Sequence, residues 1–329
     1  MIDVTIIGGF LGAGKTTLLT HILAQRAASG APGRAAVVVN DYADEGVDNW
    51  ILDAVSDVPT EIRLIAGGCV CCDRRDELTS CLIGLIGTQH RRETASGEAV
   101  TEIFIETSGV ADPGTIVELI TTHPVLQANL ALRELLVVVD SVNGESQLRH
   151  QELARAQVRN ADRLIFSKAD LAANAALAEL AALVRQLNPV AVFSQSVDGW
   201  ETELPDSVVR QAAERPPVPL HDDDDGGWAP AAWVAALSPR ISWAEYAVWL
   251  DALTRAHPQG VLRSKGMIHT ANGPLVLQSV GNVIALPRTA ESFADTARET
   301  ATAMVFILQG ITAEQLALSL ETFVPSARP

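Results

Sequence analysis

The sequence predicts an α/β protein: a mostly parallel sheet flanked by helices, followed by a small α+β domain. Three observations lead to this prediction. Near the N-terminus, a glycine-rich turn separates a buried-type apolar run from an amphipathic helical pattern. Strand-like apolar runs then alternate with helical patterns over about 200 residues. From residue 215 the composition changes to a stretch rich in proline, glycine and aspartate, which predicts a linker.

These observations divide the chain of 329 residues into three parts. Residues 1–214 are predicted to form the sheet domain, residues 215–237 an acidic linker, and residues 238–329 the C-terminal domain. A chain of this length suffices for one large or two medium domains. In the linker, His221 stands beside Asp222–Asp225, and we interpret this charge run as a solvated segment rather than a weak cation buffer.

Composition narrows the classes of function. The chain is 48% hydrophobic and carries a formal net charge of −16, which argues against a general affinity for nucleic acid or anionic lipid. The N-terminal residues, MIDVTIIGGF, lack a basic signal-peptide region, and no apolar run reaches the length of a membrane span. We therefore expect a cytoplasmic protein, in which cysteine thiols stay reduced.

The first element is a buried strand that runs into a nucleotide-binding turn. Residues 9–16 read G-F-L-G-A-G-K-T, which satisfies G-x-x-x-x-G-K-[ST] between a strand and a helix and makes the sheet P-loop NTPase-like. Backbone N–H groups of such a turn close around phosphates, and the helix dipole favours their charge. Lys15 would reach the β- and γ-phosphates, and the Thr16 hydroxyl would bind Mg²⁺. The predicted nucleotide-binding residues of this turn are Gly9, Gly12, Ala13, Gly14, Lys15, Thr16 and Thr17.

The next two strands end in acidic segments. "AAVVVN" leads into a loop with Asp41, Asp44 and Asp48, and hard carboxylates at a strand end suit Mg²⁺ or a second metal. The alternative for this loop is a solvated acidic turn. "EIFIETSG" then places Glu106 and Gly109 where P-loop proteins carry their Walker B acid and nucleotide-sensing loop. Lys15, Thr16, Glu106 and Asp41 are the predicted catalytic residues.

A strand ending at Asp140 comes next, and the strand after it predicts a guanine-binding loop. Residues 167–170 read S-K-A-D at the place where GTPases carry N-K-x-D, so Asp170 would accept hydrogen bonds from the guanine ring and the Lys168 stem would pack on it. This pattern favours GTP over ATP. Ser167 replaces asparagine, which predicts weaker bracing of the loop. The strand "VAVFSQS" would bring Ser194 near the base.

Three of the four cysteines lie within four positions, at Cys69, Cys71 and Cys72. Adjacent cysteines form a strained disulfide, and a cysteine cluster in a reducing compartment more often binds metal or does redox chemistry. Thiolates suit Zn²⁺ and Co²⁺. A structural zinc site normally takes two separated ligand pairs, so this cluster predicts an open site from which the ion can leave. Cys81 falls on the apolar face of the following helix and is predicted to pack in the core.

The order of these motifs resembles that of the CobW-type metallochaperone GTPases, relatives of the urease- and hydrogenase-maturation GTPases. The resemblance rests on the P-loop, N-D-Y-A-D-E-G-V-D, G-C-V-C-C, E-T-S-G-V-A-D-P and S-K-A-D, and V-L-R-S-K-G at residues 261–266 extends it to the C-terminal domain. It implies that Cys69, Cys71 and Cys72 bind a transition metal and that Asp44 and Asp41 match the acidic loop. His123 matches a histidine that some relatives carry. An accessory metal ligand is one interpretation of it, and a helix-end histidine at the surface is the favoured one.

The resulting functional hypothesis is a GTP-dependent metallochaperone that binds Zn²⁺ or Co²⁺ and couples GTP hydrolysis to delivery of the ion. GTP, GDP and Mg²⁺ are the other expected ligands. The expected partner is a client metalloenzyme or a protein of a metal-cofactor pathway, with a nucleotide- or metal-dependent homodimer as a further option. Two alternatives stay open: an assembly factor that docks on one metalloenzyme, such as a nitrile-hydratase-like enzyme, and a small-molecule kinase with redox-sensing thiols.

Overall fold

The computed structural model describes residues 1–31, 33–40, 60–64, 75–90, 99–216, 231–236, 241–281, 283–285, 287–289 and 303–327. The chain divides into two units. The first contains the described residues of 1–186 and 191–220, and the second contains residues 187–190 and the described residues from 231 onward. Each unit is described separately below.

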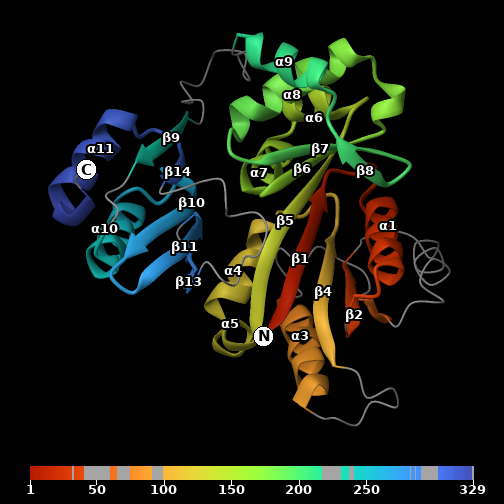
Figure 1. Ribbon diagram of the computed structural model, residues 1–329, viewed down its shortest axis with the longest axis horizontal. Coiled ribbons are helices and arrows are strands. Elements are labelled where there is room, and N and C mark those ends of the chain that lie inside the picture. The colour runs from red at the N-terminus through yellow and green to blue at the C-terminus, as the bar shows by residue number, and fades with distance from the viewer. Residues whose placement is uncertain are drawn as a thin grey trace. The chain divides into compact units, whose positions relative to one another are not determined.

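The first unit is built on an eight-stranded sheet with the order β3-β2-β4-β1-β5-β6-β7-β8 (Figure 1). Its strands are β1 (Ile2–Gly9), β2 (Arg34–Asn40), β3 (Thr60–Leu64), β4 (Val100–Thr107), β5 (Leu130–Asp140), β6 (Arg163–Ser167), β7 (Val192–Val197) and β8 (Trp200–Glu203). The strands β1 to β7 pair in parallel, and only β8 is antiparallel to its neighbour. Strands β1, β4 and β5 are almost continuously buried because helices cover both faces of the parallel sheet.

Strand β8 is an element that the sequence analysis did not predict. It forms a hairpin with β7 through Asp198 and Gly199, whose φ angles are 49° and 86°. An Asp-Gly pair with two positive φ angles is the preferred two-residue turn of a hairpin, since it matches the twist of the paired strands. The sheet therefore ends on an antiparallel edge beyond β7.

Helices cover both faces of this sheet. They are α1 (Lys15–Ala28), α3 (Arg75–His90), α4 (Gly114–Thr122), α5 (Pro124–Asn129), α6 (Gly144–His150), α7 (Glu152–Asn160), α8 (Asn174–Leu187) and α9 (Asp206–Glu214), with a 3₁₀ turn at Ala169–Leu171. Helix α1 buries Leu18, Leu19 and Leu23 against alternate residues of the central strands, such as Ile7 and Val37. Helix α3 contacts β4 and α5, and α4 and α5 contact β5.

The parallel strands all direct their carboxyl ends to one edge of the sheet, where open α/β sheets bind ligands. The turn 10–14 follows β1, the loop 108–113 follows β4, residues 141–143 follow β5, and residues 168–171 follow β6. Because β4, β1, β5 and β6 are neighbours in the sheet, these four segments lie next to one another. Most of the motifs predicted from the sequence therefore meet along this edge.

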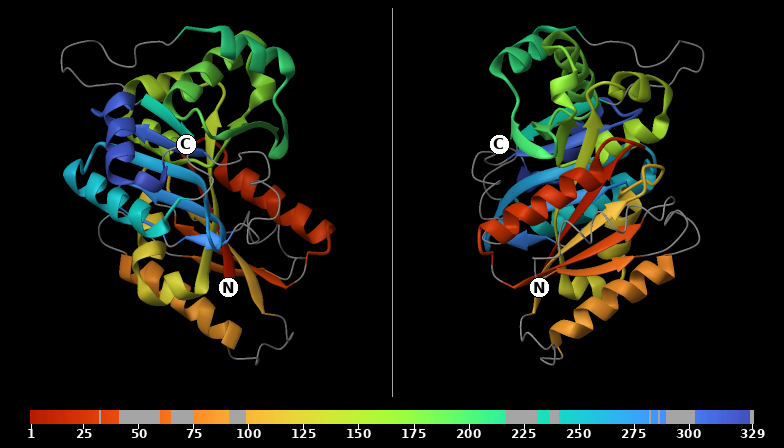
Figure 2. Two further views of the ribbon diagram at one scale, coloured as in Figure 1. Left: turned by 60° about the vertical axis from the view of Figure 1, so that its left-hand side comes forward. Right: turned by 90° about the vertical axis from the view of Figure 1, so that its right-hand side faces the viewer.

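The second unit is an antiparallel sheet with two helices on one face (Figure 2). Its strands are β9 (Ala231–Ala236), β10 (Val261–Thr270), β11 (Gly273–Val280), β12 (Val283–Ile284), β13 (Arg288–Thr289) and β14 (Ala303–Leu308). They follow the order β12-β11-β10-β14-β9 in the sheet, and β13 also pairs with β11. The helices are α10 (Trp243–Ala256) and α11 (Ala313–Phe323), and a 3₁₀ turn follows at Pro325–Ala327. Tyr246 and Trp249 of α10 and Leu316 of α11 pack against Phe306 of the sheet. The aromatic residues Tyr246 and Trp249 of α10 are thus part of the core.

Two details differ from the sequence analysis. Strand β9 pairs with β14 along its whole length, although residues 215–237 were assigned to a linker; the short apolar run A-A-W-V-A-A belongs to the second sheet. Cys81 is half-buried on α3, whereas its neighbours Leu78, Leu82 and Leu85 are fully buried, so it lies at the margin of the core rather than within it. Among the described residues, no helix is long and apolar enough to cross a membrane.

Candidate nucleotide-binding site

The turn between β1 and α1 has the geometry of a phosphate-binding loop. Gly12 and Gly14 have φ angles of +71° and +93°, a region that residues with a Cβ rarely adopt. Apart from the chain neighbours of Gly12, no described residue has an atom within 4 Å of the position that a Cβ would take there. Gly14 caps α1 without a side-chain hydrogen bond. The first N–H groups of the helix therefore face the same concavity, which suits an anion.

Lys15 and Thr16 begin α1 at this loop. The Lys15 ammonium donates a 3.4 Å hydrogen bond to the carbonyl of Phe10, so the cation lies along the loop, and the side chain is 7% exposed. The Thr16 hydroxyl donates a 2.6 Å hydrogen bond to a carboxylate oxygen of Glu106, at the end of β4. Glu106 is 1% exposed. A hydroxyl and a buried carboxylate side by side at a phosphate loop are the hard oxygen donors that Mg²⁺ prefers, so the residues present fit this ion.

The loop 108–113 packs directly on the phosphate loop. A Cβ added to Gly109 would lie 2.6 Å from the backbone nitrogen of Leu11, so only glycine permits this approach. Residues of α7 hold the loop from the other side: Gln157 donates a 2.8 Å hydrogen bond to the carbonyl of Ala111, and Asn160 donates one of 3.2 Å to Asp112. These two amides are functional candidates that sequence reasoning missed, because nothing in a helical pattern marks a residue that contacts a loop 48 positions earlier.

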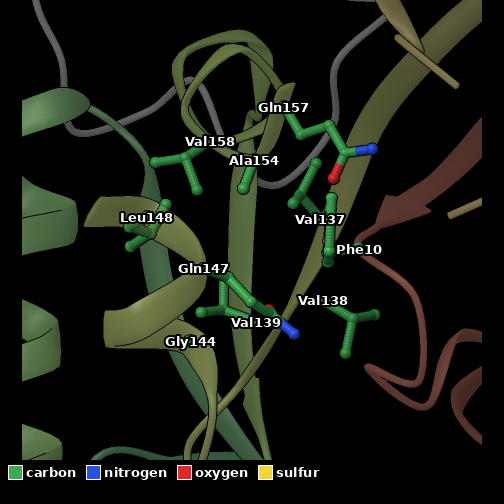
Figure 3. Close-up of a pocket in the computed structure, with 10 residues that line it drawn as sticks. All are labelled: Phe10, Val137, Val138, Val139, Gly144, Gln147, Leu148, Ala154, Gln157 and Val158. Atoms are coloured by element: carbon green, nitrogen blue, oxygen red, sulfur yellow. The ribbon is translucent and has the colours of Figure 1, made fainter. Parts of the chain in front are cut away.

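A small cavity of about 10 Å³ lies between this α7 anchor and the phosphate loop (Figure 3). Its walls include Phe10 of the phosphate loop, Val138 of β5, Gln147 of α6 and Gln157 of α7. The volume accommodates one water molecule, and the two glutamines supply polar partners for it. The cavity is too small for a nucleotide, so the phosphate loop and its neighbouring loops remain the candidate binding surface.

The predicted base loop is tied to the phosphate loop. The Ser167 hydroxyl is buried and donates to the carbonyl of Ala13 at 2.6 Å, with the Val139 carbonyl at 3.4 Å. A Cβ at Gly14 would lie 3.9 Å from the Ser167 side chain, an ordinary van der Waals distance, so the φ angle of +93° rather than contact with Ser167 favours glycine there. Serine therefore reaches the phosphate loop directly. The expectation that it braces the base loop more weakly than asparagine would stays a prediction. Asp170 is exposed on the 3₁₀ turn that follows.

Asp140 and Lys168 form an ion pair at the same edge. Their charged atoms are 2.7 Å apart, and Lys168 also donates to the carbonyl of Gly12 at 2.9 Å. Burial by itself would raise the pKa of Asp140, but hydrogen bonds from Lys168, Asn143 and the backbone of Val142 outweigh it and hold the pKa below its ordinary value. The sequence analysis placed Asp140 at a strand end and gave it no role. Its position after a buried parallel strand was the available signal.

The β7–β8 hairpin borders α1 on the base side of the site. Ser194 donates a 2.6 Å hydrogen bond to Glu201 of β8, so its hydroxyl is engaged within the hairpin. The rings of His21 and Trp200 meet edge to face, with centroids 4.9 Å apart, and Trp200 is 54% exposed. The ring of His21 also lies within hydrogen-bonding distance, 2.9 Å, of the Thr17 carbonyl. The hairpin turn is therefore anchored on the first turns of α1.

The predicted metal ligands fall outside the described residues. These are Cys69, Cys71, Cys72, Asp41, Asp44 and Asp48. In the parts of the chain that the structure describes, no group of three or more histidine, cysteine or acidic side chains could hold a metal ion. His123 is described: it stands between α4 and α5, and its Nδ1 accepts a 3.5 Å hydrogen bond from the backbone N–H of Leu126. A capping role agrees with a helix-end histidine.

A glycine-rich phosphate loop between β1 and α1, a buried carboxylate at the end of β4 and a base-type loop after β6 define a P-loop nucleotide-binding domain. The chain belongs to the CobW/HypB/UreG family. Residues 3–195 match the CobW/HypB/UreG nucleotide-binding domain, and residues 231–324 match the C-terminal domain of the cobalamin synthesis protein CobW. The family expected from the sequence motifs is confirmed.

Several relatives have names that refer to zinc. The zinc chaperone YjiA of Escherichia coli (strain K12) is 35% identical over 174 residues, which cover 53% of this chain and 51% of the relative. The zinc-regulated GTPase metalloprotein activator 1 of Schizosaccharomyces pombe is 29% identical over 202 residues, 60% of this chain and 46% of the relative. The zinc chaperone CobW of Pseudomonas aeruginosa is 28% identical over 337 residues, which cover 91% of this chain and 86% of the relative. The chain thus matches about half the length of the first two relatives.

Solved structures confirm the fold class. The Zn(II)-bound YjiA GTPase from E. coli superposes with a TM-score of 0.57 at 21% sequence identity, covering 98% of each chain. A Zn(II)-bound triple mutant of the same GTPase gives a TM-score of 0.60 at 21% identity, covering 98% of this chain and 99% of the other. At this identity the likeness establishes the fold: a mostly parallel P-loop sheet with a C-terminal antiparallel domain.

Proposed function

We propose that this protein is a GTP-dependent metallochaperone, which hydrolyses GTP to GDP and phosphate and couples hydrolysis to delivery of a transition-metal ion. The proposal of magnesium-dependent GTP hydrolysis rests on the 2.6 Å hydrogen bond between Thr16 and Glu106 beside the phosphate loop. A magnesium-dependent NTPase needs a hydroxyl and a carboxylate together at this place. The family assignment and the names of the relatives support the metal part.

The chemical roles follow from position. Lys15 would neutralise charge on the β- and γ-phosphates, while the N–H groups of the turn 12–17 orient them. Thr16 and Glu106 would hold Mg²⁺, which supplies charge neutralisation of the transferred phosphoryl group when bound. Asp41, in the acidic loop outside the described residues, is proposed as the further catalytic acid. No arginine finger is assigned within the motifs, so slow intrinsic hydrolysis is expected.

Guanine preference is assigned to the loop 167–170. The Asp170 carboxylate would accept from guanine N1–H and the 2-amino group, a pair of donors that adenine lacks. The Lys168 stem would pack against the ring. Ser167 supports this assignment because its bond to Ala13 fixes the loop to the phosphate loop. Gly109, next to Leu11, would sense the γ-phosphate from the opposite side.

The metal is cargo rather than a resident cofactor. Cys71 and Cys72 are the proposed principal ligands, with Cys69 and Asp44 as additional ones. Thiolates select soft and borderline ions, and both Zn²⁺ and Co²⁺ satisfy that chemistry. We favour Zn²⁺ because the relatives bear zinc in their names. GTP would order the loops that carry these residues, and hydrolysis would release them together with the ion.

The coupling between GTP binding and metal binding must be reciprocal. If GTP tightens metal binding by some factor, metal must tighten GTP binding by the same factor. The client would be a metalloenzyme or a protein of a metal-cofactor pathway, and a nucleotide- or metal-dependent homodimer would present the paired loops to it. The acidic chain is expected to act in the cytoplasm and to bind neither nucleic acid nor membranes.

The test is an anaerobic titration of the reduced 329-residue protein with Co²⁺ and, by competition, with Zn²⁺. Each series is run with Mg²⁺ and GDP, and with Mg²⁺ and a non-hydrolysable GTP analogue. We expect the analogue to tighten metal binding by about tenfold, within the usual range of allosteric coupling. The double variant Cys71→Ser/Cys72→Ser should lose thiolate-to-cobalt absorption.

Cys81→Ser is the matched control, because Cys81 is the fourth thiol and lies on α3 outside the cluster. It should leave metal affinity and absorption unchanged. Equal and weak metal binding with both nucleotides would reject the chaperone hypothesis. The assembly-factor alternative would then lead, since it requires docking on a client and no tight metal site; the name of the fission-yeast relative, a metalloprotein activator, is compatible with that role.

A further inference from the structure

We propose that Asp140 is a positioning residue for guanine recognition: it fixes Lys168 and, through Lys168, the backbone of the base loop that carries Asp170. The proposal rests on the assignment of residues 167–170 as the base loop, made above. Asp140 itself would touch no nucleotide. Its effect would appear in the discrimination between guanine and other bases rather than in phosphate binding.

The carboxylate of Asp140 is placed by the fold with little freedom. It ends β5, the strand between β1 and β6, and the residue is 1% exposed. One oxygen accepts hydrogen bonds from the backbone N–H groups of Val142 and Asn143 at 2.8 and 3.1 Å. The other oxygen accepts from the Asn143 amide at 3.1 Å and from Lys168 at 2.7 Å. One oxygen thus shapes the turn after β5, and the other holds the lysine.

Lys168 needs such an anchor because of its backbone. Its φ and ψ angles are 54° and 34°, the left-handed conformation that a residue with a Cβ adopts rarely. This single residue redirects the chain from β6 into the 3₁₀ turn Ala169–Leu171, and Asp170 lies on that turn. Without the Asp140 carboxylate, Lys168 would keep only the Gly12 carbonyl as a partner. Its backbone would then relax toward ordinary angles and would move the Asp170 carboxylate with it.

The ion pair also connects the base loop to the phosphate loop. The Lys168 ammonium bridges the Asp140 carboxylate and the carbonyl of Gly12 in the phosphate loop. The Asp140 side chain is 2% exposed and the Lys168 side chain 37% exposed, so the acid is shielded from solvent while the lysine stem remains accessible to a ring. The pKa of Asp140 lies below its ordinary value, which keeps the carboxylate ionised at neutral pH.

The experiment compares Asp140→Asn with the wild-type protein, both as the 329-residue chain. The asparagine carbonyl can still accept from the turn after β5, but its amide replaces the acceptor of Lys168. Affinities for GDP, IDP and ADP are measured by isothermal titration calorimetry with Mg²⁺; IDP lacks only the 2-amino group of guanine. We expect GDP affinity to fall by about tenfold, the size of a lost charged hydrogen bond. The affinities for IDP and ADP should change much less, so the ratio of the GDP affinity to the IDP affinity (the GDP-to-IDP ratio) should shrink.

Two further variants separate positioning from general stability. Glu134→Gln is the matched control, because Glu134 pairs with Arg163 at 3.1 Å near the opposite end of the same two strands. It should leave the GDP-to-IDP ratio unchanged. Lys168→Met should reproduce the loss of discrimination, and adding Asp140→Asn to it should have no further effect, since both act through one contact. If Asp140→Asn fails to fold, Lys168→Met alone still tests whether the pair sets the ratio.

The outcomes are distinguishable. A wild-type protein that prefers GDP to ADP, with an unchanged GDP-to-IDP ratio in both Asp140→Asn and Lys168→Met, overturns this proposal and leaves the base-loop assignment standing. A wild-type protein with no preference for GDP over ADP overturns the base-loop assignment and this proposal with it. Loss of the ratio in both variants, together with non-additivity in the double variant, supports it.

Discussion

The side-chain amide of Gln157, on α7, donates a 2.8 Å hydrogen bond to the backbone carbonyl of Ala111, in the loop that follows β4. The Gly109 carbonyl lies 3.5 Å from the same amide. Gln157 is 1% exposed, so these carbonyls depend on it rather than on water. Because the loop begins just after Glu106, the position of α7 is linked to the proposed nucleotide-sensing segment.

Replacing Gln157 by leucine should therefore slow GTP hydrolysis while leaving GDP binding nearly intact. The variant leaves a buried carbonyl without its donor, at a cost of about 1–3 kcal/mol in the free energy of unfolding. The phosphate loop and base loop keep their own contacts, so the effect should fall on kcat. Steady-state hydrolysis and GDP titration measure the two quantities. Gln147→Leu changes the other glutamine lining the same cavity and should leave kcat close to wild type.

The approach of Gly109 to the phosphate loop gives a second prediction. In Gly109→Ala, the new methyl group would lie 2.6 and 2.7 Å from the backbone nitrogen and Cα of Leu11, so one of the two loops must move. We expect a loss of GTP affinity and hydrolysis of about tenfold or more, because misplacement of about 1 Å has such effects. Equilibrium binding of a fluorescent GTP analogue and phosphate release are the readouts.

Gly84→Ala is the matched control for that variant. Gly84 lies within α3, and apart from the backbone of that helix no atom of the described residues lies within 4 Å of the position of an added Cβ. Alanine in a helix is more stable than glycine by about 0.5–1 kcal/mol, so this variant should unfold at a higher urea concentration and hydrolyse GTP normally. Equal losses of activity in Gly84→Ala and Gly109→Ala would contradict the steric argument.

Much of the fold was predictable because buried parallel strands and amphipathic helices have distinct apolar patterns. The P-loop and the strand that carries Glu106 were both recognised from such patterns, and the structure confirms these elements. Strand β9 was not recognised: six residues of A-A-W-V-A-A beside a Pro/Gly-rich stretch become a strand only through pairing with β14. Strand β8 likewise depends on the turn at Asp198 and Gly199.

The site was predictable to the extent that its chemistry is local in sequence. The phosphate loop and S-K-A-D are contiguous motifs, so their residues could be named directly. Asn160 and Gln157 act across 46 to 48 positions and follow only from the packing of α7. The Ser167 brace shows the same limit, since the distance from its hydroxyl to the Ala13 carbonyl is set by how closely two loops approach.

The contact between Thr16 and Glu106 predicts a magnesium-specific defect. Thr16→Ala removes the hydroxyl, so GTP hydrolysis should fall by about a hundredfold and the dependence of GTP affinity on Mg²⁺ should flatten. Thr16→Ser should restore most of the activity because it keeps the oxygen. Thr20→Ala is the helix control: its hydroxyl donates to the Thr17 carbonyl one turn away, and its loss should not change the magnesium dependence. A magnesium titration at fixed GTP analogue distinguishes the two.

The second unit offers a prediction about stability and pH. Tyr246 is fully buried in the aromatic core beside Trp249, and its hydroxyl has no hydrogen-bond partner among the described residues. Burying an unpaired hydroxyl is unfavourable, so Tyr246→Phe should raise the free energy of unfolding by about 1 kcal/mol near neutral pH. Ser319→Ala should lower the free energy of unfolding, because it removes the hydroxyl that accepts the 2.9 Å hydrogen bond of the Trp249 indole N–H.

Alkaline pH should widen the difference between Tyr246→Phe and the wild-type protein. Burial raises the pKa of Tyr246 well above its ordinary value of about 10. The unfolded tyrosine therefore loses its proton at a lower pH than the folded one, and the wild-type protein loses stability as the pH rises above about 10. Phenylalanine has no ionisable proton, so the Tyr246→Phe variant does not lose stability in this way. Urea denaturation followed by tryptophan fluorescence at pH 8 and above about pH 10 measures it; a difference between the two proteins that stays constant with pH would contradict a desolvated tyrosine.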